Sequence, residues 1–258
     1  MYKRQVKFDH FITQAKKLNC DKVATGHYAK IIKKNNEFEL HKADYLDKDQ
    51  SYVLHMLKSS DLENISFPLG EISKPEVRQI AARIGLKTAF KKDSQDICFV
   101  GKKDYRSFVE KRIDLTSPGE IFDIEGNKVG DHNGIHEFTV GQRKGLPGGY
   151  GTPRYVTKIN VQNKNVTIGE KKDLLVSSFI VEELSCVNDL EYNNLTIQTR
   201  YNSEDLPCEI KKLSDTKVLV QLKEPAFGVA PGQFGVIYNG TKVVCGGRIS
   251  PKVLENIG

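Results

Sequence analysis

The 258-residue sequence contains no long apolar run and no paired cysteines, and each absence excludes a class of protein. No apolar run approaches the roughly 18 residues that a membrane-spanning helix needs, and the first residues lack the apolar core of a secretion signal. The five cysteines are widely spaced, without a C-x-x-C pair. The sequence therefore excludes a disulfide framework or a closed zinc site as the organising device, and we expect a cytoplasmic protein with no metal centre and no membrane partner.

Positive charge is concentrated in the first part of the chain. Residues 1–112 hold 23 Lys and Arg against 15 Asp and Glu, a net charge of +8, whereas residues 113–258 hold 16 against 18, a net charge of −2. A positive field raises the local concentration of a polyanion such as RNA, because phosphate contacts supply the sequence-independent part of nucleic-acid affinity. Charge alone favours an ordinary lysine-rich surface, so an RNA partner needs support from motifs.

The pattern of apolar residues divides the chain into an α/β part and a β-rich part. Helical spacing predicts a helix over residues 5–19, and a capping box that begins at Ser73 predicts another over residues 74–84. A hairpin over residues 119–127 and a glycine-rich stretch after it indicate a small central domain. From about residue 170, short alternating runs separated by turn residues are typical of a β-barrel or a β-sandwich.

Cys98 is the cysteine with the most reactive sequence context. Lysine pairs precede and follow it, and nearby positive charge favours the thiolate, which is the nucleophilic form. Asp93 and Asp96 oppose this effect. For a single cysteine an inert, buried thiol is the more frequent situation, and we assign that interpretation to the other four cysteines.

Several short segments carry groups that suit RNA or a nucleotide. After a predicted short strand, Gly26 permits close backbone approach to a ligand, and His27 can donate a hydrogen bond to a phosphate or a base. An arginine, an aromatic ring and an amide on barrel loops are groups that hold RNA phosphates and unstacked bases. Each segment alone also has an ordinary structural explanation, such as a helix N-cap. The other segments are Lys48-Asp49-Gln50, Arg200-Tyr201, Gln233 and the basic turn Gly141–Leu146. For the basic turn, RNA contact is the minority interpretation.

Six segments occur in the order found in bacterial-type tRNA-specific 2-thiouridylases, and the sequence resembles this family from about residue 7 to about residue 249. They are Thr25–Ala29, Lys48–Tyr52, Lys92–Phe99, Gly141–Leu146, Thr199–Tyr201 and Pro231–Gln233. The resemblance implies an α/β plus all-β protein. Its expected domains are a partial nucleotide-binding α/β domain of the PP-loop ATPase type over residues 1–102, a small central domain over 103–168 and a C-terminal β-barrel over 169–258.

The resemblance also implies an activity. Such an enzyme is a tRNA-uridine 2-sulfurtransferase, which uses ATP with magnesium to activate C2 of the wobble uridine and replaces its oxygen with sulfur. The sulfur arrives as a cysteine persulfide from a donor protein, such as a cysteine desulfurase or a sulfur relay. By this likeness Cys98 is the catalytic persulfide cysteine and Gly26 is a backbone contact for ATP. The positions implied to contact tRNA are His27, Lys48, Asp49, Gln50, Arg200, Tyr201 and Gln233.

The sequence departs from the family pattern near its amino terminus. Family members begin with a strand and a Ser-Gly-Gly-x-Asp-Ser phosphate loop, and they carry a second cysteine in an Asn-Pro-x-x-x-Cys-Asn segment; neither segment occurs here. A second thiol is needed to attack the persulfide or to resolve it by forming a disulfide. We therefore expect an amino-terminally truncated copy that is incomplete for turnover. A non-catalytic RNA-binding remnant and a redox-sensing thiol at Cys98 are the alternatives.

Overall fold

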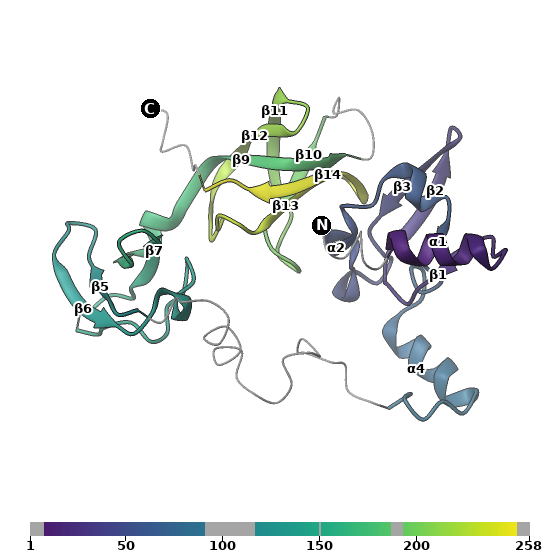
Figure 1. Cartoon of the computed structure of the whole chain (residues 1–258), viewed down its shortest axis with the longest axis horizontal. Helices are drawn as coiled ribbons and strands as arrows, with labels where there is room; N and C mark the ends of the chain where they lie inside the picture. The colour runs from purple at the N-terminus through teal and green to yellow at the C-terminus, as the bar shows by residue number, and fades with distance from the viewer. Residues whose placement is uncertain (1–7, 91–116, 150, 187–192, 252–258) are drawn as a thin grey trace. The chain divides into compact units, whose positions relative to one another are not determined.

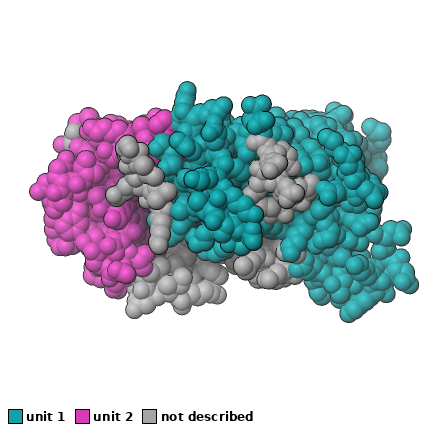
Figure 2. Space-filling model, turned by 90° about the horizontal axis from the view of Figure 1, so that it is seen from above, with its two compact units in different colours: residues 1–91, 177–224, 231–258 teal, residues 92–176, 225–230 magenta. Residues whose placement is uncertain are grey.

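The computed structural model describes residues 8–90, 117–149, 151–186 and 193–251. The chain groups into two compact units, which Figure 2 distinguishes by colour. Unit 1 consists of residues 1–91, 177–224 and 231–258, and unit 2 consists of residues 92–176 and 225–230. Unit 1 thus combines the amino-terminal α/β part with most of the carboxyl-terminal strands.

The amino-terminal part of unit 1 contains short helices and two small strand pairs (Figure 1). Its elements are α1 (His10–Lys17), β1 (Val23–Ala24), β2 (Lys30–Lys34), β3 (Glu37–His41), η2 (Leu46–Lys48), α2 (Ser51–Leu54), α3 (Ser59–Leu62), β4 (Ile65–Ser66) and α4 (Lys74–Arg83). Strands β1 and β4 pair in parallel, with Val23 opposite Ile65, and β2 and β3 form an antiparallel hairpin. Parallel pairing beside helices confirms the predicted α/β character of this part.

The helix predicted from the capping box at Ser73 is confirmed. The hydroxyl of Ser73 accepts the Glu76 N–H at 3.4 Å, and the Glu76 carboxylate accepts the Ser73 N–H at 2.9 Å. These contacts satisfy backbone groups that have no partner inside the helix, so α4 begins at Lys74. Gly85 follows the helix with a φ of 74°, a left-handed conformation that ends it at low cost.

The carboxyl-terminal strands of unit 1 form a closed six-stranded barrel. They are β9 (Leu175–Cys186), β10 (Leu195–Gln198), β11 (Leu206–Ser214), β12 (Lys217–Phe227), β13 (Phe234–Asn239) and β14 (Lys242–Ile249). The strand order is β13-β10-β11-β12-β9-β14, and pairing of β13 with β14 closes the barrel. Leu195 and Ile197 of β10 alternate inward with more exposed neighbours, which is the period-2 pattern that a barrel wall requires. The predicted C-terminal β-barrel is therefore confirmed.

The barrel sheet continues into the amino-terminal part through β3. Strand β14 pairs with β3 where Lys242 lies opposite His41, and the Lys42 amide donates to the Thr241 carbonyl at 2.8 Å. The ammonium of Lys242 also lies 2.7 Å from the Glu39 carboxylate. One hydrophobic cluster includes residues from both regions, since Leu40 of β3 and Tyr238 of β13 belong to it and are fully buried. The two parts of unit 1 thus share a sheet and a core.

Unit 2 contains a four-stranded sheet in the order β6-β5-β8-β7. Its elements are β5 (Gly119–Phe122), β6 (Lys128–His132), η3 (Ile135–Glu137), β7 (Tyr155–Asn160), β8 (Asn165–Gly169) and η4 (Lys171–Leu174). Strands β5 and β6 form the predicted hairpin, and the core beneath the sheet includes Ile121, Val156, Val166 and Ile168. In the part of the chain that the structure describes, no helix is both long and apolar enough to span a membrane.

We predict that Gly246→Ala destabilises unit 1, because the added methyl group has no room. A Cβ at Gly246 lies 2.5 Å from the ring of His55, which is 3% exposed. The ring cannot move away easily, because its Nδ1 lies 2.7 Å from the Tyr52 carbonyl and its centroid lies 4.8 Å from that of Phe234. Overpacking of this kind costs roughly 1–3 kcal/mol of unfolding free energy, measurable by denaturant titration.

Gly148→Ala is the matched control, because a Cβ there meets no atom within 4 Å. We expect it to change the free energy of unfolding by less than about 0.5 kcal/mol. Equal stability of the two variants would contradict the close packing of the His55 ring against Gly246 of β14.

Candidate functional site

The predicted catalytic residue, Cys98, lies outside the described residues. Within them, Cys20 is an exposed free thiol, and Cys208 and Cys245 are buried free thiols. Burial raises the pKa of Cys208 to about 12, so this thiol stays protonated and inert. The prediction of a buried thiol is confirmed for Cys208 and Cys245 and is wrong for Cys20, which is exposed. The disulfide that the family chemistry implies has no counterpart among these three residues. Persulfide chemistry at Cys98 stays a prediction.

Three of the predicted tRNA-contact segments meet in unit 1. Tyr52, which follows the segment 48–50, donates its hydroxyl hydrogen to the Phe234 carbonyl at 2.8 Å, and Phe234 directly follows Gln233. The rings of Tyr52 and Tyr201 lie 6.2 Å apart. The fold therefore brings Lys48-Asp49-Gln50, Arg200-Tyr201 and Gln233 to one junction between α2 and the barrel.

Asp49 is a buried residue that holds the loop before α2. One carboxylate oxygen accepts hydrogen bonds from the backbone amides of Ala43 at 2.8 Å and Ser51 at 3.3 Å, and the other accepts from the Ser51 hydroxyl at 2.6 Å. The Ser51 hydroxyl also lies 3.2 Å from the Tyr238 hydroxyl of the barrel. Burial raises the pKa of the Asp49 carboxyl, and the donated hydrogen bonds act against that rise. The structure thus gives Asp49 a positioning role, and its contact with tRNA stays a prediction.

Gln50 joins this loop to the segment that contains the predicted nucleotide contact. Its side-chain carbonyl accepts a hydrogen bond from the Tyr28 backbone amide at 3.1 Å, and its backbone amide donates to the Tyr28 carbonyl at 2.7 Å. Tyr28 follows Gly26 and His27. The two predicted segments are therefore held in a fixed relation, although they lie more than 20 residues apart along the chain.

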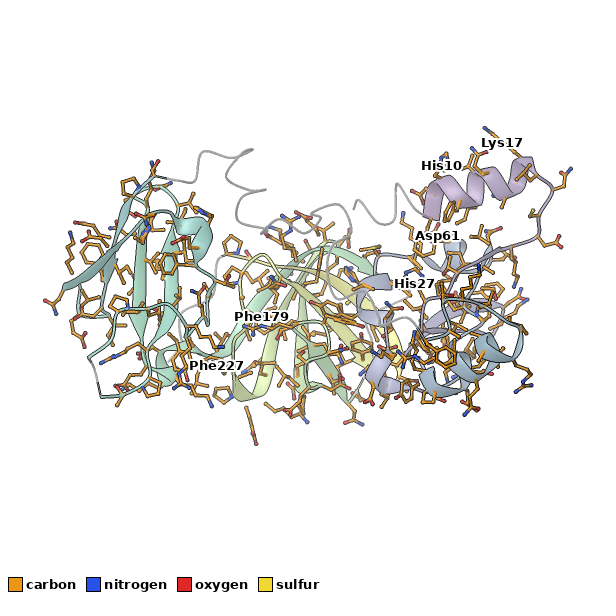
Figure 3. All side chains as sticks on the ribbon, turned by 90° about the horizontal axis from the view of Figure 1, so that it is seen from below. His10, Lys17, His27, Asp61, Phe179 and Phe227 are labelled. Carbon is orange, nitrogen blue, oxygen red and sulfur yellow. The ribbon has the colours of Figure 1, made fainter. Side chains whose placement is uncertain are left out.

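Gly26 and His27 lie on the loop that follows β1, and Figure 3 labels His27 there, with His10 and Lys17 at the two ends of α1. Gly26 is exposed, and a Cβ added to it meets only the Leu69 side chain at 3.7 Å. The backbone at Gly26 is thus open to a ligand, as a nucleotide contact requires. His27 is half-buried, with its Nδ1 2.8 Å from the Thr25 hydroxyl. Both assignments stay predictions.

A cavity of about 540 Å³ opens beside the junction. Tyr52 and Tyr201 line it, and burial raises the pKa of Tyr52 to about 12, so that its hydroxyl remains a hydrogen-bond donor at neutral pH. The positive charge of Arg200 acts against the rise in pKa that burial causes at Tyr52. The positive charge of Lys48 does the same at Tyr201. Both cations therefore act electrostatically on the tyrosine pair. The other lining residues are Lys42, Leu46, Asp47, Asp49, Gln198, Asn202, Ser203, Glu204 and Asp205.

The sequence analysis missed the ion pair that joins the two sides of this cavity. The buried ammonium of Lys42 lies 2.6 Å from the Asp205 carboxylate and 4.2 Å from the centroid of the Tyr238 ring. Lys42 and Asp205 are separated by 163 positions, and no short motif links them. An unpaired buried charge is costly, so this pair fixes how β3 meets the barrel loop. Across the ranges that the structure covers, no cluster of His, Cys, Asp and Glu suits a metal ion.

We predict that Asp49→Ala destabilises the protein even when no ligand is present. The substitution removes the acceptor of two backbone N–H groups and one hydroxyl group, which costs roughly 1–3 kcal/mol of unfolding free energy. Asp47→Ala removes a nearby exposed carboxylate and serves as the control, with an expected change below about 0.5 kcal/mol. If Asp49 acts only by touching a ligand, denaturant titration will give both variants the same stability as the parent protein.

Comparison with known protein families matches each of the three parts of the chain to a family model. Residues 2–102 match the model described as the tRNA methyl transferase HUP domain, and residues 106–170 match the tRNA methyl transferase PRC-barrel domain. Residues 176–249 match the aminomethyltransferase beta-barrel domain. The three matched regions cover most of the sequence, in an order that agrees with the α/β part, the four-stranded unit and the barrel.

The chain is also similar over nearly its whole length to curated proteins. It is 40% identical over 252 residues to the tRNA-specific 2-thiouridylase MnmA of Chloroflexus aurantiacus, a match that covers 96% of this chain and 70% of the relative. The protein of the same name from Rickettsia prowazekii is 40% identical over 255 residues, covering 97% of this chain and 71% of the relative. That from Geobacter metallireducens is 38% identical over 256 residues, covering 98% and 70%. The chain belongs to the tRNA-specific 2-thiouridylase family.

Proposed function

We propose that this chain acts in the 2-thiolation of tRNA, in which sulfur replaces the C2 oxygen of the wobble uridine. The observation that carries the proposal is the convergence of the segments 48–50, 200–201 and 233 at one junction of unit 1. Tyr201 is 45% exposed, which suits stacking on an unpaired base, and the exposed Arg200 beside it suits a phosphate. Membership of the family supports the same conclusion.

The proposed reaction needs an activated carbon and a sulfur nucleophile, because C2 of uridine is a poor electrophile with a poor leaving oxygen. ATP, bound with magnesium, would supply activation by transferring its AMP group to the C2 oxygen with release of pyrophosphate. The terminal sulfur of a persulfide on Cys98 forms a bond to C2, and AMP leaves with the original oxygen. A second thiol would then attack the Cys98 sulfur, break the sulfur–sulfur bond, leave the terminal sulfur on C2 and form a disulfide. The family carries that thiol in a segment that does not occur in this sequence, so the proposal includes that this chain alone is incomplete for turnover. A cysteine desulfurase or a sulfur-relay protein is the proposed source of the persulfide.

The residues of this chain have distinct proposed roles. Gly26, whose backbone is open, lies against ATP. Both carboxylate oxygens of Asp49 accept hydrogen bonds inside the protein, so Asp49 positions the loop. Its proposed contact with tRNA is part of the contact that the loop makes. The remaining proposed tRNA contacts are His27, Lys48, Gln50, Arg200, Tyr201 and Gln233.

We predict that Cys98 accepts sulfur. After incubation of the protein with a cysteine desulfurase and cysteine, mass spectrometry of peptides should find one additional sulfur atom on Cys98. Cys98→Ser should abolish the gain, whereas Cys20→Ser, which removes an exposed free thiol, should leave it unchanged. A protein that binds tRNA but gains no sulfur on Cys98 would be a non-catalytic RNA-binding protein. Oxidation of Cys98 by peroxide without affinity for tRNA would instead indicate a redox-sensing thiol.

We also predict that Tyr201→Ala weakens binding of tRNA about tenfold, because stacking of a base on an aromatic ring contributes about 1–3 kcal/mol. Tyr201→Phe keeps the ring and should retain nearly all of the affinity. Leu213→Ala removes a side chain that is similarly exposed, at 48%, on barrel strand β11 and serves as a control. Filter binding at fixed salt measures all three, and a Tyr201→Ala variant with the affinity of the control would exclude the stacking role.

A further inference from the structure

A turn in unit 2 presents two cations on its tip. Arg143 and Lys144 are exposed and lie between Gly141 and Gly145, whose φ angles are 88° and 77°. Among the described residues, neither side chain takes part in a hydrogen bond or an ion pair. Left-handed backbone on both sides of the pair is readily available only to glycine, so the sequence Gly-Gln-Arg-Lys-Gly forms this turn without strain.

The side chain of Gln142 ties the turn together from inside. Its carbonyl oxygen accepts the Thr139 amide at 3.0 Å, and its amide group donates to the Lys144 carbonyl at 2.9 Å. The backbone amide of Gln142 donates to the Thr139 carbonyl at 2.8 Å. Both ends of one carboxamide are thus used to hold the backbone on either side of Arg143.

The turn is also anchored to the body of unit 2. The Gly141 amide donates to the Val156 carbonyl at 2.8 Å, and the Val156 amide donates to the Gln142 carbonyl at 2.9 Å. Leu146, directly after the turn, packs against the core cluster that contains Val156. A backbone held in this way needs little further ordering when its exposed side chains meet a ligand, which lowers the entropic cost of binding.

The two cations of the turn differ from two other lysines of the same unit, Lys128 and Lys172. Lys128 lies 2.8 Å from the Glu120 carboxylate and 2.9 Å from that of Asp131, and Lys172 lies 3.2 Å from Glu170. Those lysines are neutralised within the fold, whereas the charges of the turn are available to an external anion. Adjacent guanidinium and ammonium groups suit neighbouring phosphates of a nucleic-acid backbone.

We propose that the turn Gly141–Gly145 is a second tRNA-binding surface, at which Arg143 and Lys144 contact the phosphate backbone. This inference rests on the proposed function and adds a contact that is carried by unit 2. Because phosphate contacts carry no sequence information, the turn contributes affinity and orientation, and the junction in unit 1 contacts the bases.

The test compares the double variant Arg143→Gln, Lys144→Gln with the parent chain by tRNA binding over a series of salt concentrations. Loss of two phosphate contacts should weaken binding about tenfold near 0.1 M salt and reduce the slope of log affinity against log salt by about 1 to 2. The double variant Lys158→Gln, Lys172→Gln removes the same charge from the same unit and is the control. Its affinity should fall by no more than about twofold, because Lys172 is already paired with Glu170, and an exposed charge such as Lys158 that touches no phosphate is largely screened at this salt.

Gln142→Ala tests the positioning part of the proposal, since it keeps both cations but removes the tie. We expect weaker binding of tRNA, by a few-fold, with an unchanged salt slope. A turn variant that binds like its control overturns the proposal and leaves the proposed function intact. Absence of tRNA binding by the parent chain overturns both. If the turn variant binds tRNA normally but no longer receives sulfur from the desulfurase, the turn contacts an acidic protein and the proposal is wrong.

Discussion

The candidate site depends on the attachment of one polar loop to the wall of the barrel. Asp49 accepts a hydrogen bond from Ser51, Ser51 contacts Tyr238, and Tyr52 separately donates to the Phe234 carbonyl, so two sets of hydrogen bonds join the amino-terminal part to β13. Ser51 and Tyr238 are fully buried, and Asp49 is 7% exposed. Buried polar groups stabilise a structure only when their partners are in place, so this network admits one arrangement of loop and barrel.

That arrangement explains how residues far apart in the sequence come to act together. The loop carries Lys48 and Gln50, and the barrel carries Arg200, Tyr201 and Gln233. The contacts of Tyr52 with Tyr201 and with the Phe234 carbonyl join the two sets. Pairing of β3 with β14 and the ion pair between Lys42 and Asp205 add two further constraints on the same junction. These links hold the amino-terminal loop and the barrel in one arrangement.

Much of the fold could be predicted from the sequence, because its signals are local. The capping box at Ser73 specified the start of α4, and alternating runs specified strands such as β10 and β13. The sharing of a sheet between β3 and β14 could not be predicted, because pairing over some 200 residues leaves no pattern in either strand.

The sequence predicted which residues belong to the candidate site better than it predicted what each residue does. The motifs around residues 48–50 and 200–201 were recognised from their order along the chain, and the fold places them together. The contact of Asp49 with tRNA stays a prediction, but the sequence could not reveal its positioning role, because a carboxylate at the end of η2 looks the same in sequence whether it faces solvent or a buried amide. Lys42, Asp205 and Tyr238 were missed because their importance arises from burial and pairing, which only the folded chain provides.

Hydrogen exchange of the backbone amides, measured in the unmodified protein without ligand, tests the shared junction most directly. Amides of the loop and α2, such as those of Gln50 and Val53, should open with the same free energy as those of Val236 and Ile237 in β13. A common value would mean that loop and barrel open as one cooperative element. Rapid exchange in the loop beside a protected β13 would mean that the two regions open independently, which would contradict a junction that the loop and the barrel share.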